Sequence, residues 1–192
     1  GRSPRSGPCE ASGAVWVGTA FGGVARFTGD AFMHFTDRDG LASRTVTAIH
    51  RTPDDLLYLA TAGGGVARWN GEVVTVFGPG SGLTDPTVQC LGEDVQGFLL
   101  AGTEGSGLFR GRGDRFERIP ASKGIDALDI RCIQLDREGR SWVGTDRGLY
   151  ADPGDGRYMH IAGLDHPVNN VECNGDTLWA TTDRGLFLLP TR

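Results

Sequence analysis

Acidic, basic and histidine side chains stand before several short apolar runs of this 192-residue chain. Asp85 and Asp129 could supply the paired carboxylates that a lyase or a glycosidase uses for acid and base catalysis. Each aspartate also fits an ordinary turn at the entrance to a strand. No pair of histidines has metal-ligand spacing, and the sequence contains no Gly-x-Ser-x-Gly motif. We therefore expect no catalytic residue, no metal site and no cofactor.

The four cysteines allow two interpretations. Cys90 and Cys132 occupy the same place in two copies of a repeated pattern, and no close C-x-x-C pair exists. We expect small buried hydrophobic residues here, because free cysteine is among the most buried residue types. Cys9 and Cys173 lie in the first and last repeats. If those repeats are neighbours in a closed ring, a bond between the two thiols could lock the seam.

A short motif that ends in threonine recurs with a nearly fixed period. The marker residues are Thr19, Thr61, Thr103, Thr145 and Thr182, so the steps are 42, 42, 42 and 37 residues. Periods of about 40 to 50 residues belong to β-propellers or to solenoids of paired helices. Each repeat is rich in glycine and in β-branched or aromatic residues, without a long stretch at helical spacing. The sequence therefore predicts an all-β protein, a β-propeller.

Each repeat carries the signals of four antiparallel strands, which make one blade. The first and innermost strand is expected at 46–51, 88–91, 130–135 and 168–173. A tight turn from an acid to a glycine follows it, as at Asp94 and Gly97. The second strand carries a large residue that should pack between blades, at Trp16, Tyr58, Leu100, Trp142 and Trp179. Arginines of the third strand should pack their stems over the blade, at Arg26, Arg68 and Arg110.

The whole chain, 1–192, is expected to form one propeller or partial propeller domain. Its repeats span approximately 9–41, 42–83, 84–125, 126–164 and 165–192. The first repeat lacks a credible inner strand, because Pro4 and Pro8 do not suit a central strand. The last repeat ends after its third strand. With about 42 residues per blade, the sequence predicts three complete blades flanked by two partial ones.

Unpaired sheet edges at both ends of the chain would need partners. Three situations fit: an unusual ring of about five blades, a fragment of a longer propeller, or a chain completed by another copy of itself. We expect either a tight ring in which Cys9 and Cys173 come close or a homo-oligomer joined through the end repeats.

The repeat combines Gly-Leu, Val-x-x-Ile, Asp-x-x-Gly, Trp-Val-Gly-Thr and Gly-Gly-Val-x-Arg, best seen across 46–77, 88–119 and 130–161. This pattern resembles the two-component-regulator propeller repeat, from about Glu10 to Leu189. The resemblance implies a periplasmic or extracellular sensor region of a bacterial signalling receptor, which binds a ligand or partner and performs no chemistry. Because the shared motifs are structural, the resemblance implies no catalytic residue.

Composition excludes some classes of partner. The net charge of −5 and the lack of a basic cluster argue against nucleic acid, which needs a positive face. No apolar run approaches the roughly 18 residues of a membrane span, so we expect no membrane contact from this chain. The chain does not begin with a signal peptide, so any targeting segment would lie outside it.

A ligand is expected on the face where linkers enter the inner strands, because loops converge there. The candidate residues are Arg44, Asp85, Asp129, Arg131, His166 and Asn169 from the strand entrances, with Arg147 and Arg184 from neighbouring loops. The favoured function is a binding module for a small molecule, a glycan or a partner protein. The alternatives are a propeller enzyme, of lyase or glycosidase type, and an engineered or excised fragment whose main property is assembly.

Overall fold

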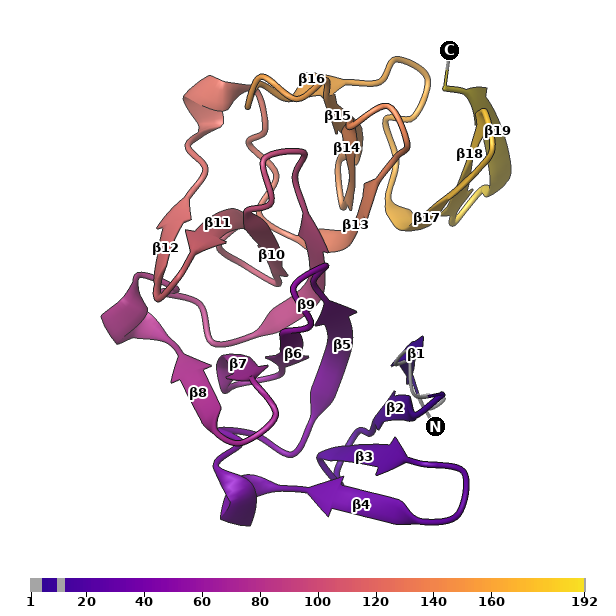
Figure 1. Ribbon diagram of the computed structural model, residues 1–192. Coiled ribbons are helices and arrows are strands. Elements are labelled where there is room, and N and C mark those ends of the chain that lie inside the picture. Colours follow the sequence, from indigo (N-terminus) through magenta and orange to yellow (C-terminus); the bar gives the residue numbers. More distant parts are fainter. Residues whose placement is uncertain (1–4, 10–12, 192) are drawn as a thin grey trace. The chain divides into compact units, whose positions relative to one another are not determined.

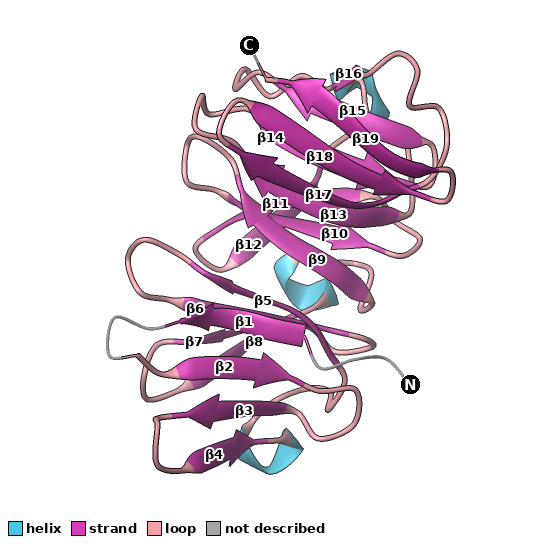
Figure 2. Cartoon of the chain, turned by 90° about the vertical axis from the view of Figure 1, so that its right-hand side faces the viewer, coloured by secondary structure: helices cyan, strands magenta, loops and turns pink. Residues whose placement is uncertain are grey.

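The computed structural model describes residues 5–9 and 13–191, with the backbone alone for 5–9. The described part is built from antiparallel strands in five separate sheets, with three 3-10 helices of three residues each (Figures 1 and 2). The predicted all-β, propeller-type repeat is confirmed. The chain forms two compact units, Gly1–Leu91 and Gly92–Arg192.

The first unit holds two four-stranded sheets. The first sheet has the order β1 (Arg5–Cys9), β2 (Val15–Gly18), β3 (Val24–Phe27) and β4 (Phe32–Phe35). The second has the order β5 (Val46–Arg51), β6 (Leu57–Thr61), β7 (Gly65–Trp69) and β8 (Val74–Phe77). The first strands of the two sheets, β1 and β5, contact each other, as expected for inner strands of a propeller.

The second unit holds three sheets. Its border with the first unit falls within β9 (Val88–Glu93), the first strand of the third sheet. The third sheet contains β9, β10 (Leu99–Thr103), β11 (Leu108–Arg112) and β12 (Arg115–Arg118). The fourth contains β13 (Ile130–Leu135), β14 (Ser141–Thr145), β15 (Gly148–Asp152) and β16 (Met159–His160). The fifth contains only β17 (Val168–Asn174), β18 (Thr177–Thr182) and β19 (Gly185–Pro190), as predicted for a repeat that ends after its third strand.

The expectation that the first repeat lacks an inner strand is wrong. The backbone of β1 pairs antiparallel with β2, so the first sheet has four strands, and the described residues form four complete sheets and one partial sheet instead of the predicted three and two. β1 is an edge strand, and its register shifts between Ser6 and Cys9, the stretch that contains Pro8. Proline is tolerated at edges and bulges because its missing N–H is not needed there. Pro4 lies outside the described residues.

The marker threonines close the turn between the second and third strands of every sheet. Each hydroxyl donates a hydrogen bond of 2.8–3.0 Å to the carbonyl oxygen of a glycine. The pairs are Thr19 with Gly23, Thr61 with Gly65, Thr103 with Gly107, Thr145 with Gly148, and Thr182 with Gly185. All five glycines have positive φ, a conformation that other residues adopt only with strain. The period of the sequence is therefore the period of this turn.

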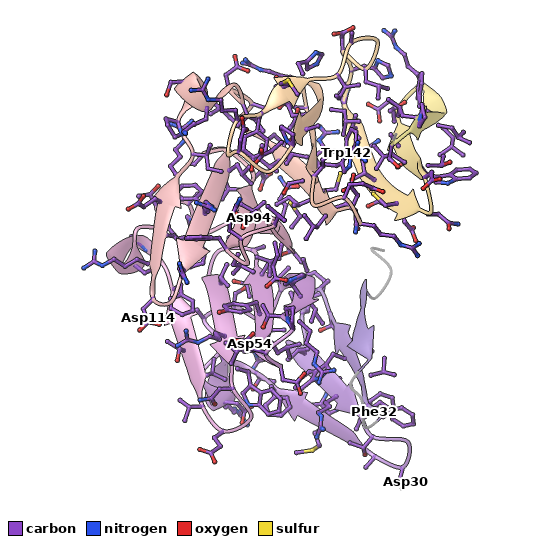
Figure 3. All side chains as sticks on the ribbon, turned by 45° about the horizontal axis from the view of Figure 1, so that its top comes forward. Asp30, Phe32, Asp54, Asp94, Asp114 and Trp142 are labelled. Atoms are coloured by element: carbon purple, nitrogen blue, oxygen red, sulfur yellow. The ribbon has the colours of Figure 1, made fainter. Side chains whose placement is uncertain are left out.

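Hydrophobic cores lie between neighbouring sheets within each unit. In the first unit Trp16 packs with Leu57, Leu59 and Ala67 of the second sheet. In the second unit Trp142 packs with residues of the last sheet (Figure 3). The prediction that the large residue of the second strand packs between blades is confirmed at these two positions.

The cysteines fit the simpler interpretation. Cys90 and Cys132 are buried thiols, as expected. Cys173 is a free thiol and is half-buried. That free thiol contradicts the expected bond between Cys173 and Cys9, whose side chain lies outside the described residues.

Candidate functional site

In the first unit, the predicted site residues make local contacts. Arg44 Nε donates a hydrogen bond of 2.6 Å to Asp37 Oδ1, which lowers the pKa of that exposed carboxyl. Asp85 Oδ1 accepts a hydrogen bond of 2.9 Å from the backbone N–H of Thr87, as in an ordinary turn before a strand. Both side chains therefore have a structural role at the entrance to an inner strand.

In the second unit, three predicted residues come together in a connected polar chain. Arg131 Nε donates to Asp129 Oδ2 across 3.2 Å, and Arg131 Nη1 donates to Asn169 Oδ1 across 2.7 Å. Asn169 Nδ2 in turn donates to Asp183 Oδ1 across 2.8 Å. The polar chain of Asp129, Arg131, Asn169 and Asp183 thus links the start of β13 to β17 and to the turn after β18.

Sequence reasoning missed Asp183, although a signal for it exists. The stretch Thr-Asp-Arg-Gly-Leu occurs at 145–149 and again at 182–186. The arginines of this stretch, Arg147 and Arg184, were predicted, whereas the aspartates before them were not considered. The repetition marks Asp146 and Asp183 as equivalent positions in the corresponding loops of two repeats.

The other predicted residues of the second unit are engaged elsewhere. Arg147 Nη1 pairs with Asp126 Oδ2 at 2.9 Å, and both side chains are exposed. The backbone N–H of Arg184 donates to Thr182 Oγ1 at 3.1 Å. The ring of His166 lies 5.3 Å from that of Phe187, and its buried Nε2 has no hydrogen-bond partner among the described residues.

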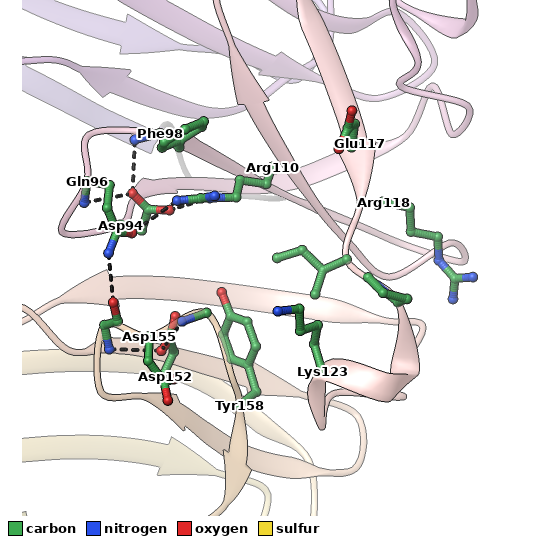
Figure 4. A pocket seen from close by; sticks show the side chains of 14 residues that line it. Asp94, Gln96, Phe98, Arg110, Glu117, Arg118, Lys123, Asp152, Asp155 and Tyr158 are labelled. Atoms are coloured by element: carbon green, nitrogen blue, oxygen red, sulfur yellow. Dashed lines mark hydrogen bonds and ion pairs between the residues drawn. The ribbon is translucent and has the colours of Figure 1, made fainter.

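A hollow of about 460 Å³ lies elsewhere in the second unit, which we call the wedge pocket (Figure 4). Its walls are the turn after β9, strands β11 and β12, the segment that follows β12, and the loop after β15. The residues used below are Asp94, Gln96, Phe98, Arg110, Asp152 and Tyr158. The volume falls within the range of ligand pockets. The residues predicted from sequence do not line it.

One wall is organised by the buried carboxylate of Asp94. Asp94 Oδ1 accepts backbone hydrogen bonds from Gln96 and Phe98, each of 3.0 Å. Asp94 Oδ2 accepts one of 2.5 Å from Arg110 Nε, and Arg110 Nη2 donates to Gln96 Oε1 at 3.0 Å. The guanidinium carbon of Arg110 lies 3.6 Å from the centre of the Phe98 ring, a cation–π contact.

The two earlier members of this arginine series make similar ring contacts. Arg26 lies over Trp16 at 5.8 Å and Arg68 over Phe77 at 5.1 Å. The guanidinium groups of all three arginines thus lie over aromatic rings, and the packing of their stems over the blade stays a prediction.

The facing wall is the loop after β15. Asp152 is buried, and its Oδ1 accepts hydrogen bonds from the backbone of Gly154 at 2.8 Å and Gly156 at 3.0 Å. Gln96 Nε2 donates to the carbonyl oxygen of Gly154 across 2.7 Å. This bond ties the two walls together within the unit.

Tyr158 contributes a phenol hydroxyl to the wedge pocket. Its side chain is buried, and its hydroxyl points toward the wall that carries Asp94 and Arg110 (Figure 4). No hydrogen bond joins this hydroxyl to any part of the chain that the structure describes. Burial raises the pKa of Tyr158, and the nearby carboxylates of Asp152 and Asp94 raise it further. The hydroxyl therefore stays protonated and can donate a hydrogen bond.

The side chains described for residues 13–191 include no group of three or more histidine, cysteine, aspartate or glutamate residues placed to hold a metal ion. The described part of the chain also contains no helix long and apolar enough to cross a membrane.

No family model and no curated protein matches the sequence. Solved structures do match. The extracellular domain of a putative one-component system from B. thetaiotaomicron has a TM-score of 0.78 and 22% identity, over 96% of this chain and 27% of that one. Virginiamycin B lyase from Staphylococcus aureus has a TM-score of 0.71 and 14% identity, over 97% and 69%. A gluconolactonase from Xanthomonas campestris has a TM-score of 0.68 and 14% identity, over 95% and 70%.

These similarities establish the fold, and the predicted resemblance to extracellular propeller domains of two-component systems is confirmed at that level. The chain spans about a quarter of the length of the sensor-type structure that it matches at 22% identity. Sensor domains and propeller enzymes both occur among the matches.

Proposed function

We propose that this chain is a non-catalytic binding module of the sensor type, which acts outside the cytoplasm. The observation that carries the proposal is the way the wedge pocket uses its two buried carboxylates. One oxygen of Asp94 and one of Asp152 each hold two backbone N–H groups of a turn, and the second oxygen of Asp94 is bound to Arg110. Carboxylates held by these hydrogen bonds serve to fix the shape of the pocket.

The groups left for a ligand are suited to hydrogen bonding. They are the protonated hydroxyl of Tyr158 and, at the exposed rim, the carboxylate of Glu117 and the ammonium of Lys123. Such a mixture of donors and acceptors fits a small polar molecule or a glycan unit rich in hydroxyls. A partner protein would instead use the partly exposed polar chain of Asp129, Arg131, Asn169 and Asp183.

The proposal is tested by the thermal midpoint of the chain in the presence of a fixed panel of monosaccharides, disaccharides and sugar acids. A ligand of the native state raises the midpoint in proportion to its saturation. The Tyr158→Phe variant should keep the midpoint of the free chain, because the lost hydroxyl makes no hydrogen bond to the described residues, and should reduce the shift. An unchanged shift in Tyr158→Phe would place the binding elsewhere.

The non-catalytic part of the proposal needs its own assay. One of the matched structures is a gluconolactonase, so glucono-1,5-lactone is a fair substrate to try. We expect hydrolysis at the rate of buffer alone. Turnover that disappears in a variant of the wedge pocket would favour the enzyme alternative.

A further inference from the structure

The large residue of the second strand is covered in four repeats and uncovered in the fifth. The exposed fraction is 2% for Trp16, 8% for Tyr58, 0% for Leu100 and 5% for Trp142, but 37% for Trp179. These residues occupy one position of the repeat, three places before the marker threonine. The difference therefore reflects what lies against the sheet.

For Trp16 and Trp142 the cover is the aliphatic face of the next sheet in the same unit. Trp16 packs on Leu57 and Leu59 of β6, and Trp142 packs on Leu178 and Ala180 of β18. Each of these two tryptophans is thus covered by small or branched apolar side chains on the second strand of the following sheet. The last sheet uses its own Leu178 and Ala180 to cover Trp142, so its opposite face carries Trp179.

That opposite face is apolar over more than one residue. Trp179 pairs with Leu188, and Thr181 pairs with Leu186, so Trp179, Leu186 and Leu188 lie on one side of β18 and β19. Leu186 and Leu188 are 52% and 56% exposed. We call these three residues the Trp179 face. Exposed apolar patches of this kind mark interaction surfaces.

The first sheet offers the matching surface. Val15, Val17, Phe27 and Phe32 lie 42 residues before Leu57, Leu59, Trp69 and Val74, which face Trp16. Leu57 and Leu59 are buried, whereas Val15 and Val17 are half-buried and Phe32 is exposed. We call these four residues the Val15 face. Its side chains are apolar at the same four positions of the repeat as the surface that covers Trp16, and one chain therefore carries both halves of a blade-to-blade contact.

We propose that a second copy of this chain covers the Trp179 face with its Val15 face, in the way that one sheet covers the next within a unit. The contact is heterologous, so association continues into a ring or a filament unless one face is blocked. This inference does not depend on the proposed ligand-binding function.

The test is the mass of the 192-residue chain in solution, measured by sedimentation over a wide range of concentrations. The mass should rise above the monomer mass of 20.4 kDa as concentration rises. Trp179→Asp and Phe32→Asp should each abolish the increase, since each removes one face. Leu128→Asp, at an exposed apolar residue outside both faces, should leave association unchanged.

A mixture of the two single-face variants gives the decisive result. Each variant keeps one intact face, so the mixture should form a dimer and nothing larger. If Trp179→Asp does not fold, as judged by circular dichroism, Leu188→Lys changes a more exposed residue of the same face. A wild-type chain that stays monomeric, a mixture without dimer, or a loss of association in Leu128→Asp would overturn the proposal.

Discussion

Trp142 Nε1 donates a hydrogen bond of 2.8 Å to Asp136 Oδ2, and this buried bond stabilises the turn between β13 and β14. The same carboxylate accepts Arg140 Nε at 2.7 Å and, through Oδ1, the backbone N–H groups of Glu138 and Arg140. A buried carboxylate with four donors is stabilised in its charged form.

The first prediction is that Asp136→Asn destabilises the chain by about 2–3 kcal/mol at neutral pH. The amide would direct N–H groups at the donors of Trp142 and Arg140. Urea unfolding, followed by circular dichroism, measures the loss. Asp30→Asn, at an exposed aspartate, is the control and should change the free energy of unfolding by less than about 0.5 kcal/mol.

The pH dependence of the same variant has a definite sign. Burial raises the pKa of Asp136, but the hydrogen bonds from Trp142 and Arg140 outweigh burial and leave it below its usual 3.8. A lowered folded-state pKa contributes stability above the unfolded-state value, and this contribution is lost as pH falls through the folded-state value. The difference between wild type and Asp136→Asn should therefore shrink below about pH 4. A difference that is constant from pH 7 to pH 3 would contradict this account.

The second prediction concerns the middle residue of the marker motif. A Cβ added at Gly144 would lie within van der Waals overlap of Cys132 Sγ and 2.9 Å from Val168 Cγ1. Gly144→Ala should therefore cost about 1–3 kcal/mol through overpacking. Gly80→Ala is the matched control, because nothing lies within 4 Å of its added Cβ. Equal stabilities of the two variants would mean that the inner strands β13 and β17 can move away from the added Cβ without cost.

Much of the fold could be predicted because the same local interactions recur in every repeat. The threonine-to-glycine turn recurs in every sheet, so its sequence signal recurs as well. The strand β1 could not be predicted in this way, since Pro8 breaks the pattern of a central strand while being acceptable at an irregular edge.

Only part of the candidate site could be predicted from the sequence. Asp129, Arg131 and Asn169 stand at equivalent strand entrances, so topology alone predicts their meeting. The wedge pocket depends on the loop from Asp152 to Tyr158, whose course is set by side-chain hydrogen bonds peculiar to that loop. A comparison of repeats predicts only the features that the repeats share. This loop is not shared, so the wedge pocket could not be predicted in that way.

The third prediction is that replacing Asp129 and Arg131 together by alanine leaves the thermal midpoint nearly unchanged. Their ion pair is at 3.2 Å and partly solvated, and such pairs contribute about 0–1 kcal/mol. Any binding that uses the polar chain should weaken in this variant. A large loss of stability with unaltered affinity would show that the two residues are needed for packing.

The fourth prediction concerns the thiols of the second unit. Burial raises the pKa of Cys132 to about 12 and that of Cys173 to about 11, so both stay protonated at neutral pH. Because the thiolate is the nucleophile, iodoacetamide should label both slowly in the native chain and rapidly in urea. Half-buried Cys173 should react before buried Cys132. Mass spectrometry of peptides identifies each site.

The raised pKa of Cys132 also predicts an alkaline loss of stability. The unfolded thiol ionises near 9.0, whereas the folded thiol stays protonated to about 12, so stability is complete below pH 9 and falls between these values. Cys132→Ala should remove this part of the pH dependence while costing stability at neutral pH through a small cavity. Native labelling of Cys132 as fast as in urea, or an identical alkaline slope in Cys132→Ala, would show that the thiol is not enclosed between the inner strands.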